Sequence, residues 1–236
     1  MEPIMRTEHV SRVFQTPAQK VVALDDININ IYPGELTLLR GRSGSGKTTL
    51  LNSLSALDRP TGGNIWLGDR NIAQMRDGER DALRRKEMGF VFQAVALFSQ
   101  MTAYENVEFA LRLAGVPRKQ YAQRTKEALQ AVGLGKRMLH LPAEMSGGEQ
   151  QRVAIARGLV TEPRIIFADE PTAEVDTTMA FRIMNLFRSL AKETNMTFVI
   201  TTHDPQMMEL ADHIYTLQDG HVIDEMRRTH GEVTAQ

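Results

Sequence analysis

The chain has 236 residues, a net charge of −1, and ordinary apolar and charged fractions of 42% and 24%. These values exclude a disordered or fibrous chain, and they give no electrostatic reason to expect nucleic acid or anionic lipid as a partner. The absence of cysteine excludes disulfides and thiolate metal sites and fits a reducing compartment.

No segment of the sequence predicts membrane insertion. Residues 1–6 lack the basic-then-apolar pattern of a signal peptide. The longest apolar runs, such as residues 165–168, are strand-sized and far below the roughly 18 residues that a spanning helix needs. We therefore expect a soluble chain that works at a membrane only through a partner.

Strands and turns are predicted for the first seventy residues. Apolar segments at 10–13, 21–24 and 27–31 are separated by polar residues, and Pro33-Gly34 predicts a turn before a strand at 36–39. A hairpin arm is expected at 64–67, just before Gly68-Asp69.

The pattern changes at about residue 100. Up to about residue 160, apolar residues recur at helical spacing, as in Val107, Ala110, Leu111 and Ala114. Strand-sized runs at 165–168 and 197–201 then flank a helical pattern over 180–191. This alternation predicts an α/β fold with a mostly parallel sheet covered on both faces. We expect one domain, residues 1–236, with a core formed by 1–93 and 153–236 and an inserted helical lobe at 94–152.

Residues 41–48 match a phosphate-binding loop. They lie between the strand at 36–39 and a helix-prone run from Thr49, and they read Gly41-Arg42-Ser43-Gly44-Ser45-Gly46-Lys47-Thr48. Glycines let backbone N–H groups curl around a phosphate, and the following helix N-terminus adds positive potential. Lys47 supplies a cation for the terminal phosphates, and the Thr48 hydroxyl can ligate Mg²⁺. The alternative is a glycine-rich turn that matches the motif by chance. Such a turn would not need a strand before it and a helix after it, so the sequence predicts binding of a nucleoside triphosphate.

Three polar residues follow the two later strands. Asp169 and Glu170 come directly after the apolar run 165–168, and His203 follows the strand at 197–201. The carboxyl ends of parallel strands meet at the edge where α/β folds place ligands. We expect Asp169 to orient Mg²⁺ and Glu170 to act as general base on the attacking water. Taken singly, an acidic pair after a strand is usually a solvated turn, and the histidine could equally be a structural residue.

A further motif decides between these interpretations. Residues 145–152, Met-Ser-Gly-Gly-Glu-Gln-Gln-Arg, resemble the signature motif of ATP-binding cassette (ABC) ATPases, which is usually Leu-Ser-Gly-Gly-Gln. Other family elements appear in order. Gln93 resembles the Q-loop glutamine, Asp169-Glu170 the Walker B region, residues 173–176 (Ala-Glu-Val-Asp) the D-loop, and His203 the switch histidine. The resemblance covers residues 5–225, nearly the whole chain.

The resemblance implies a P-loop NTPase core, an antiparallel β subdomain and a helical lobe. It also implies a homodimer in which two chains sandwich two ATP molecules head to tail. The helix-prone run from Glu149 places a second helix N-terminus behind Ser146, which is a further anion site. In the family this site contacts the γ-phosphate held by the opposite subunit, which here involves Ser146, Gly147, Gly148 and Glu149.

The family also assigns roles to residues outside these motifs. Gln93 would contact Mg²⁺ or the attacking water. Asp176 would take part in communication between the two subunits of the dimer. Thr49 is the last of the residues that we expect to lie around the phosphates of ATP. Adenine stacks on an aromatic residue near the N-terminus, for which Phe14 is the candidate; packing within the small β lobe is its alternative role.

Two positions depart from the family pattern. Met145 replaces leucine, a volume-conserving apolar exchange. Glu149 replaces glutamine and adds a carboxylate that a helix start favours. Because Lys47, Asp169, Glu170 and His203 are present, we expect an active ATPase whose rate Glu149 modulates.

The compact length favours the energising subunit of a membrane transporter. A soluble cassette ATPase of DNA repair, chromosome maintenance or translation is the alternative. However, no heptads separate Lys47 from Asp169, and no basic patch for nucleic acid is evident. A P-loop kinase or GTPase would leave the signature motif unexplained.

Segments 50–52, 57–63 and 101–107 are similar to the bacterial lipoprotein-release, macrolide-export and cell-division cassettes. This implies a separately encoded integral membrane permease, a peripheral location on the cytoplasmic face of the membrane, and export or mechanotransmission as the output. In the family the segment after the Q-loop lines a groove for the permease. Residues 94–98, Ala-Val-Ala-Leu-Phe, are apolar enough for this role or for the core of the helical lobe. The cargo is recognised by the permease.

Overall fold

The computed structural model describes residues 1–17, 19–173 and 175–228. The strands are β1 (Met5–Gln15), β2 (Lys20–Ile27), β3 (Asn30–Ile31), β4 (Leu36–Arg40), β5 (Gly62–Leu67), β6 (Arg70–Asn71), β7 (Met88–Val91), β8 (Ile165–Asp169), β9 (Thr197–Thr202), β10 (His213–Gln218) and β11 (His221–Arg227). The α-helices are α1 (Lys47–Leu54), α2 (Asp77–Glu87), α3 (Ala103–Leu113), α4 (Tyr121–Ala131), α5 (Gly147–Leu159) and α6 (Thr177–Thr194). Short 3₁₀ helices are η1 (Arg118–Gln120), η2 (Pro142–Glu144) and η3 (Pro205–Leu210).

Two sheets organise the strands. The larger has the order β11–β10–β4–β9–β8–β7; β10 to β7 run parallel, and β11 pairs antiparallel with β10. The smaller sheet is antiparallel, with the order β2–β1–β5–β6 and with β3 paired to β1. The predicted α/β fold, with a mostly parallel sheet and an antiparallel β subdomain, is confirmed.

Buried side chains alternate between the two faces of the parallel sheet. In β8, Ile166 and Ala168 belong to the core beneath the helices, whereas Ile165 and Phe167 belong to the core shared with α1 and the antiparallel sheet. Successive strand residues point to opposite faces, so a strand buried on both sides is apolar throughout. This explains why the predicted strands show no polar alternation.

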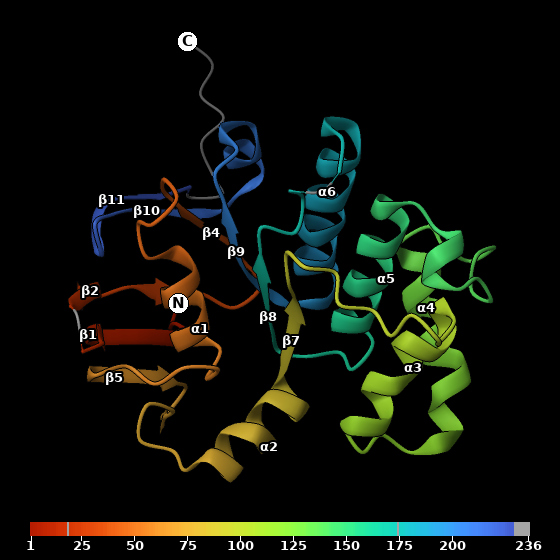
Figure 1. Cartoon of the computed structure of the whole chain (residues 1–236), viewed down its shortest axis with the longest axis horizontal. Helices are drawn as coiled ribbons and strands as arrows, with labels where there is room; N and C mark the ends of the chain where they lie inside the picture. The colour runs from red at the N-terminus through yellow and green to blue at the C-terminus, as the bar shows by residue number, and fades with distance from the viewer. Residues whose placement is uncertain (18, 174, 229–236) are drawn as a thin grey trace.

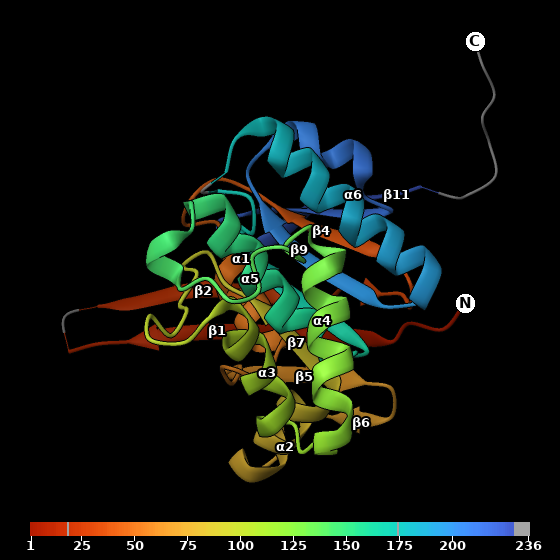
Figure 2. The same cartoon turned by 90° about the vertical axis from the view of Figure 1, so that its right-hand side faces the viewer.

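The parallel sheet lies between two layers. Figure 1 shows α1 and the antiparallel sheet on one side of it and α3, α4, α5 and α6 on the other. In Figure 2, α3, α4 and α5 stand together as one group of helices. The proposed second boundary of the helical lobe, between residues 152 and 153, falls inside α5. Among the described residues, no helix combines the length and the apolar character needed to cross a bilayer.

α5 approaches β7 so closely that only glycine fits at two positions, Gly89 of β7 and Gly158 of α5. A Cβ atom at Gly89 would lie 2.4 Å from the carbonyl oxygen of Gly158, and a Cβ at Gly158 would lie 2.9 Å from the carbonyl oxygen of Phe90. Both distances are far inside van der Waals contact, and the atoms met are backbone atoms that cannot rotate away. The end of α5 is therefore fixed to the core sheet.

Gly89→Ala is expected to lower the free energy of unfolding by about 2 kcal/mol, because overpacking forces the backbone apart. Chemical denaturation followed by circular dichroism measures the change. Gly78→Ala is the matched control, since a Cβ at this exposed position in α2 meets nothing within 4 Å and should be neutral or slightly stabilising. Wild-type stability of Gly89→Ala would show that α5 can move away from β7.

Several elements differ from the sequence-based expectation. The hairpin at 64–67 is confirmed as β5–β6, but α2 was not predicted, because it buries only Arg80 and Leu83. β10 and β11 extend the parallel sheet beyond the last predicted strand. α5 begins at Gly147, two residues before the expected start at Glu149, because Ser146 is its cap.

Candidate functional site

The phosphate loop connects the buried strand β4 to α1. Residues 41–46 lie between them, and α1 begins at Lys47. Gly46 has a left-handed backbone with φ of 102°, and a Cβ at this position would lie 2.6 Å from the carbonyl oxygen of Ala23 in β2. Only glycine fits here, so the start of α1 lies against the antiparallel sheet and its N–H groups face the loop.

Lys47 is the charge within the loop. Only 6% of this residue is exposed, and Nζ donates to the carbonyl oxygen of Gly41 at 2.9 Å and of Arg42 at 3.1 Å. A phosphate oxygen is a stronger acceptor for an ammonium group than these carbonyls are. The loop thus provides one cation and several backbone N–H groups for binding an anion. The other loop residues lie around Lys47: Arg42, Ser43 and Gly44 are exposed, Ser45 is buried, and Gly41 and Thr49 are half-buried.

Asp169 joins the loop to the ends of β8 and β9. The Thr48 hydroxyl donates toward both carboxylate oxygens of Asp169, at 3.1 and 3.2 Å. The Thr201 hydroxyl donates to Asp169 Oδ1 at 2.6 Å and accepts from the N–H of Glu170 at 2.9 Å. Hydroxyl and carboxylate oxygens converging from α1 and β8 are the ligands that Mg²⁺ prefers.

Thr201 was not predicted as a site residue. The parallel register pairs Asp169 with Thr201, which places the hydroxyl beside the carboxylate. Its position at the end of the strand 197–201 was the signal that could have identified it, because parallel strands bring their carboxyl ends to one edge.

Glu170 begins the segment after β8 with an unusual backbone. Its φ of 45° lies in the left-handed region, which costs a non-glycine residue about 1–3 kcal/mol. One carboxylate oxygen lies 3.3 Å from Nδ1 of His203, whose side chain is 66% exposed. Both residues line a cleft of about 200 Å³ together with Thr172 and Thr202. A carboxylate in this position can accept a proton from a water molecule in the cleft.

A larger cleft of about 670 Å³ is also lined by His203. The phosphate loop forms part of its wall through Gly41 and Ser43, and the β10–β11 hairpin forms another part through residues 217–219. Its volume is in the range of pockets that enclose a small molecule. The histidine therefore borders both the space beside the loop and the space beside Glu170.

Gln93 lies at the same edge of the sheet. It is exposed and follows the end of β7 by two residues, and β7 pairs with β8 through Val91 and Ala168. Within the described part of the chain, no hydrogen bond joins Gln93 to Asp169 or Glu170. The fold thus brings Gln93 near the carboxylates without fixing its side chain to them.

Phe14 lies on β1 and is not among the residues that line the two clefts beside His203. It is 41% exposed, and the guanidinium carbon of Arg12 lies 4.4 Å from its ring centroid. Arg12 is held there by two hydrogen bonds to Asp58, of 2.7 and 2.9 Å. One face of the ring is thus covered by a cation, and exposed ring surface remains for a second planar group.

Ser146 is the N-cap of α5. Its hydroxyl accepts from the N–H of Glu149 at 3.3 Å, and the Glu149 carboxylate accepts from the N–H of Ser146 at 2.9 Å. This second bond is the main reason that the pKa of Glu149 lies below its usual value. Met145 is buried in the helical core, as expected for an apolar exchange. A Cβ at Gly147 would meet nothing within 4 Å, so the helix start is open.

The signature residues are not part of the clefts around the loop. None of residues 146–148 lines the cleft beside the phosphate loop or the cleft beside Glu170. Gln151, which is buried, links α5 to the segment after Glu170 by donating from Nε2 to the carbonyl oxygen of Pro171 at 3.0 Å. Asp176 caps α6 by accepting from the N–H of Met179 at 3.0 Å. Glu174 of the predicted D-loop lies outside the described residues.

Comparison with known proteins agrees with this arrangement. The sequence profile of the ABC transporter family matches residues 24–173. The macrolide export ATP-binding/permease protein MacB of Hahella chejuensis is 41% identical over 222 residues, which cover 94% of this chain and 34% of that protein. The lipoprotein-releasing system ATP-binding protein LolD of Saccharophagus degradans is 39% identical over 218 residues, which cover 92% of this chain and 96% of that protein.

A solved structure has the same fold. The ATP-binding cassette MJ0796, in a dimeric post-hydrolysis state bound to ADP and Pi, matches with a TM-score of 0.88 and 36% identity. The match covers 94% of this chain and 98% of that one. The family profile spans the phosphate loop, the signature motif and the pair Asp169-Glu170. This chain therefore belongs to the ABC transporter family, as an ATP-binding cassette that hydrolyses ATP.

Proposed function

We propose that two copies of this chain sandwich two ATP molecules head to tail and drive a separate membrane permease, in export or mechanotransmission. The observation that carries the proposal is the separation of Ser146 from the phosphate loop. The open start of α5 is a second anion site, yet residues 146–148 line neither cleft around the loop of their own chain. A second copy that places its Ser146 over the first chain's ATP would complete the site. The dimeric MJ0796 cassette supports this arrangement.

Within this site the chain's own residues have distinct roles. Lys47 exchanges the carbonyls of Gly41 and Arg42 for the terminal phosphates of ATP. Thr48 and Asp169 hold Mg²⁺ together with Gln93; when bound, the ion neutralises charge on the phosphates. Glu170 accepts the proton of the attacking water.

Two residues lie at the limits of the proposed site. His203, 3.3 Å from Glu170, orients that carboxylate and contacts the γ-phosphate. Phe14 stacks on adenine with the ring face that Arg12 leaves open.

Thr201→Val is expected to lower kcat about tenfold and to raise the Mg²⁺ concentration needed for half-maximal activity. The substitution removes the hydroxyl that holds both Asp169 and the N–H of Glu170. Phosphate release is measured across a Mg²⁺ titration. Thr197→Val, buried at the other end of β9, is the control and should leave the Mg²⁺ requirement unchanged. If the two substitutions changed kcat and the Mg²⁺ requirement equally, Thr201 would have only a structural role.

We propose that the permease docks in an apolar groove next to the helical lobe. The groove has a volume of about 320 Å³ and is lined by Leu57, Phe92 and Leu113, with Arg84 and Arg85 at its margin. An amphipathic helix with acidic residues fits such a surface. The chain would then be located on the cytoplasmic face of the membrane, held there by the permease.

The predicted docking segment 94–98 borders this groove. Arg157, which lines the groove, donates to the carbonyl oxygens of Val95 and Ala96 at 3.1 and 2.7 Å. Leu97 packs against the helical core, and Phe98 meets Phe109 edge to face with ring centroids 5.1 Å apart. The segment thus supports the wall of the groove. The exposed apolar side chains in the groove are Leu57, Phe92 and Leu113, and Phe98 of the segment is itself 47% exposed.

Leu113→Asp tests the groove. Leu113 is 55% exposed in the groove, whereas Leu139, the matched control position, is 80% exposed and lies outside it. The tagged chain is expressed in its native cell, the membranes are solubilised in detergent, and co-purified integral membrane proteins are quantified by mass spectrometry. Wild type and Leu139→Asp should retain a permease, and Leu113→Asp should lose at least about tenfold of it, since a buried unpaired carboxylate is strongly disfavoured.

Two outcomes would contradict the proposal. Retention of the permease by Leu113→Asp would exclude this groove as the docking site. Recovery of no integral membrane protein with the wild-type chain would favour a soluble cassette ATPase.

A further inference from the structure

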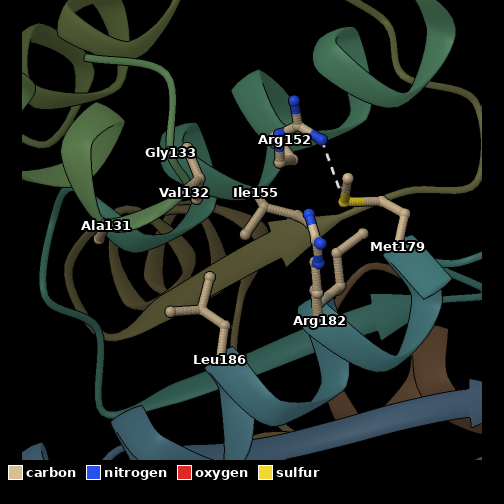
Figure 3. A pocket seen from close by; sticks show the side chains of 9 residues that line it. Ala131, Val132, Gly133, Arg152, Ile155, Met179, Arg182 and Leu186 are labelled. Carbon is tan, nitrogen blue, oxygen red and sulfur yellow. Dashed lines mark hydrogen bonds between the residues drawn. The ribbon is translucent and has the colours of Figure 1, made fainter.

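A separate pocket lies between the C-terminal end of α4 and the facing sides of α5 and α6. It has a volume of about 290 Å³ and is formed by the C-terminal end of α4 and by side chains of α5 and α6 (Figure 3). None of its lining residues belongs to the phosphate loop, to the clefts beside His203, or to the apolar groove. The pocket is therefore distinct from the sites described above.

The inner wall of this pocket is apolar. Ile155 of α5 is buried, and Leu186 of α6 is half-buried. Figure 3 shows both side chains projecting into the space between α5 and α6. A fully hydrated inorganic ion would leave this wall without a partner, so a ligand that fits the pocket has an apolar part.

Two arginines stand over the apolar wall. Arg152 donates from Nη1 to the sulfur of Met179 at 3.0 Å, and a thioether is a weak acceptor for a guanidinium. Arg182 lines the same pocket and has no ion pair with any residue that the structure describes. None of the described residues that line the pocket is acidic. Among the described residues, neither guanidinium group has a carboxylate within ion-pair distance.

The charges of the described residues around the pocket leave it positive. Glu149, one turn earlier on α5, accepts from the N–H of Ser146 and pairs with Arg137, and its attraction to Arg152 is weaker than these interactions. The C-terminal end of α4 contributes about half a negative charge, against two full positive charges on Arg152 and Arg182. An anionic group between the two guanidinium groups would gain charge-assisted hydrogen bonds that the Met179 sulfur cannot match.

We propose that this pocket binds an amphiphilic anion, with its carboxylate or phosphate group between Arg152 and Arg182 and a short hydrocarbon chain over Ile155 and Leu186. The volume is about twice that of a cavity that holds benzene, which is enough for a chain of about eight carbons. The ligand would bridge α5, which begins behind Ser146, and α6, which begins behind Asp176. Any effect of the ligand on ATP hydrolysis rests on the proposed function, but the binding itself does not.

Octanoate and octyl phosphate test the proposal. Each is titrated into the full chain without nucleotide, and binding is followed by calorimetry and by ligand-observed NMR. At least one should bind with a dissociation constant of about 1 mM or lower, as expected for a ligand of this size. The tighter-binding ligand of the two shows whether the pocket prefers a carboxylate or a phosphate head group. Inorganic phosphate, which lacks the chain, and octanol, which lacks the charge, should bind at least about tenfold more weakly.

Arg182→Gln should weaken the binding about tenfold, because it removes one charge-assisted contact from an exposed residue that the fold does not need. Lys192→Gln is the matched control: it removes the same charge from an exposed position of α6 outside the pocket and should bind like wild type. Equal loss in the two variants would overturn the proposal in favour of non-specific attraction. The proposal is also overturned if neither amphiphile binds, if octanol binds as tightly as octanoate, or if phosphate binds as tightly as octyl phosphate.

Discussion

Glu170→Gln is expected to lower ATP turnover by about 10³-fold while leaving ATP affinity unchanged. The amide keeps the shape of the side chain beside His203, but it cannot accept a proton from water, and loss of a general base costs about 10²–10⁴-fold. The phosphate loop is untouched, so nucleotide binding is retained. Phosphate release measures turnover, and equilibrium titration with a fluorescent ATP analogue measures affinity. Near-normal turnover would mean that another residue is the base.

The same variant tests the proposed dimer. Because its ATP persists, Glu170→Gln with ATP should elute as a dimer in size-exclusion chromatography with light scattering. Adding Ser146→Arg should abolish the dimer, since a bulky cation would occupy the open start of α5. Glu193→Gln, at an exposed position of α6, is the control: added to Glu170→Gln, it should leave the dimer intact. A dimer that survives Ser146→Arg would place the signature motif outside the interface.

Lys47→Ala is expected to weaken ATP binding by at least about 100-fold. The enclosed ammonium group is the cation of the loop, and charge-assisted hydrogen bonds contribute about 1.5–3 kcal/mol each. Removing it also leaves the carbonyl oxygen of Gly41 without the Lys47 donor, while that of Arg42 keeps only the N–H of Ser45 at 3.2 Å.

The effect of Lys47→Ala can be followed by thermal unfolding. ATP at about 100 times its dissociation constant should stabilise the wild-type chain by about 2.7 kcal/mol and the variant hardly at all. Lys126→Ala, at an exposed position on α4, should respond like wild type. A wild-type melting shift in Lys47→Ala would show that backbone N–H groups alone hold the phosphates.

The nucleotide motifs could be predicted because each consists of adjacent residues at the end of an apolar strand. β4, β8 and β9 are buried on both faces, so their sequences are mostly apolar and lack the alternation of polar and apolar residues found in half-exposed strands. Parallel strands gather their carboxyl ends at one edge, and this is why the phosphate loop, Asp169 and His203 could be expected near one another.

Other features depend on contacts between segments far apart in the chain. Thr201 meets Asp169 only through the register of β8 and β9. α2 lacks an apolar stripe and is held in part by buried Arg80, which donates to the carbonyl oxygen of Asp58 at 2.7 Å. The Arg80 contact leaves no local pattern in the sequence. The strand-end position of Thr201 places it at the correct edge of the sheet, but its pairing with Asp169 follows only from the register.

The two attachments of α5 have a mechanical consequence. Gly158 is fixed against β7, and Gln151 is bonded to Pro171, the residue after Glu170. We infer that α5, together with α3 and α4 packed against it, swings about Gly158 and does not slide along β7. With a rise of 1.5 Å per residue, the arm to Gln151 is about 10 Å and the arm to Ser146 about 18 Å. A displacement of the segment at Pro171 is therefore magnified about 1.7-fold at Ser146, so small movements beside the catalytic carboxylate become larger ones at the signature motif.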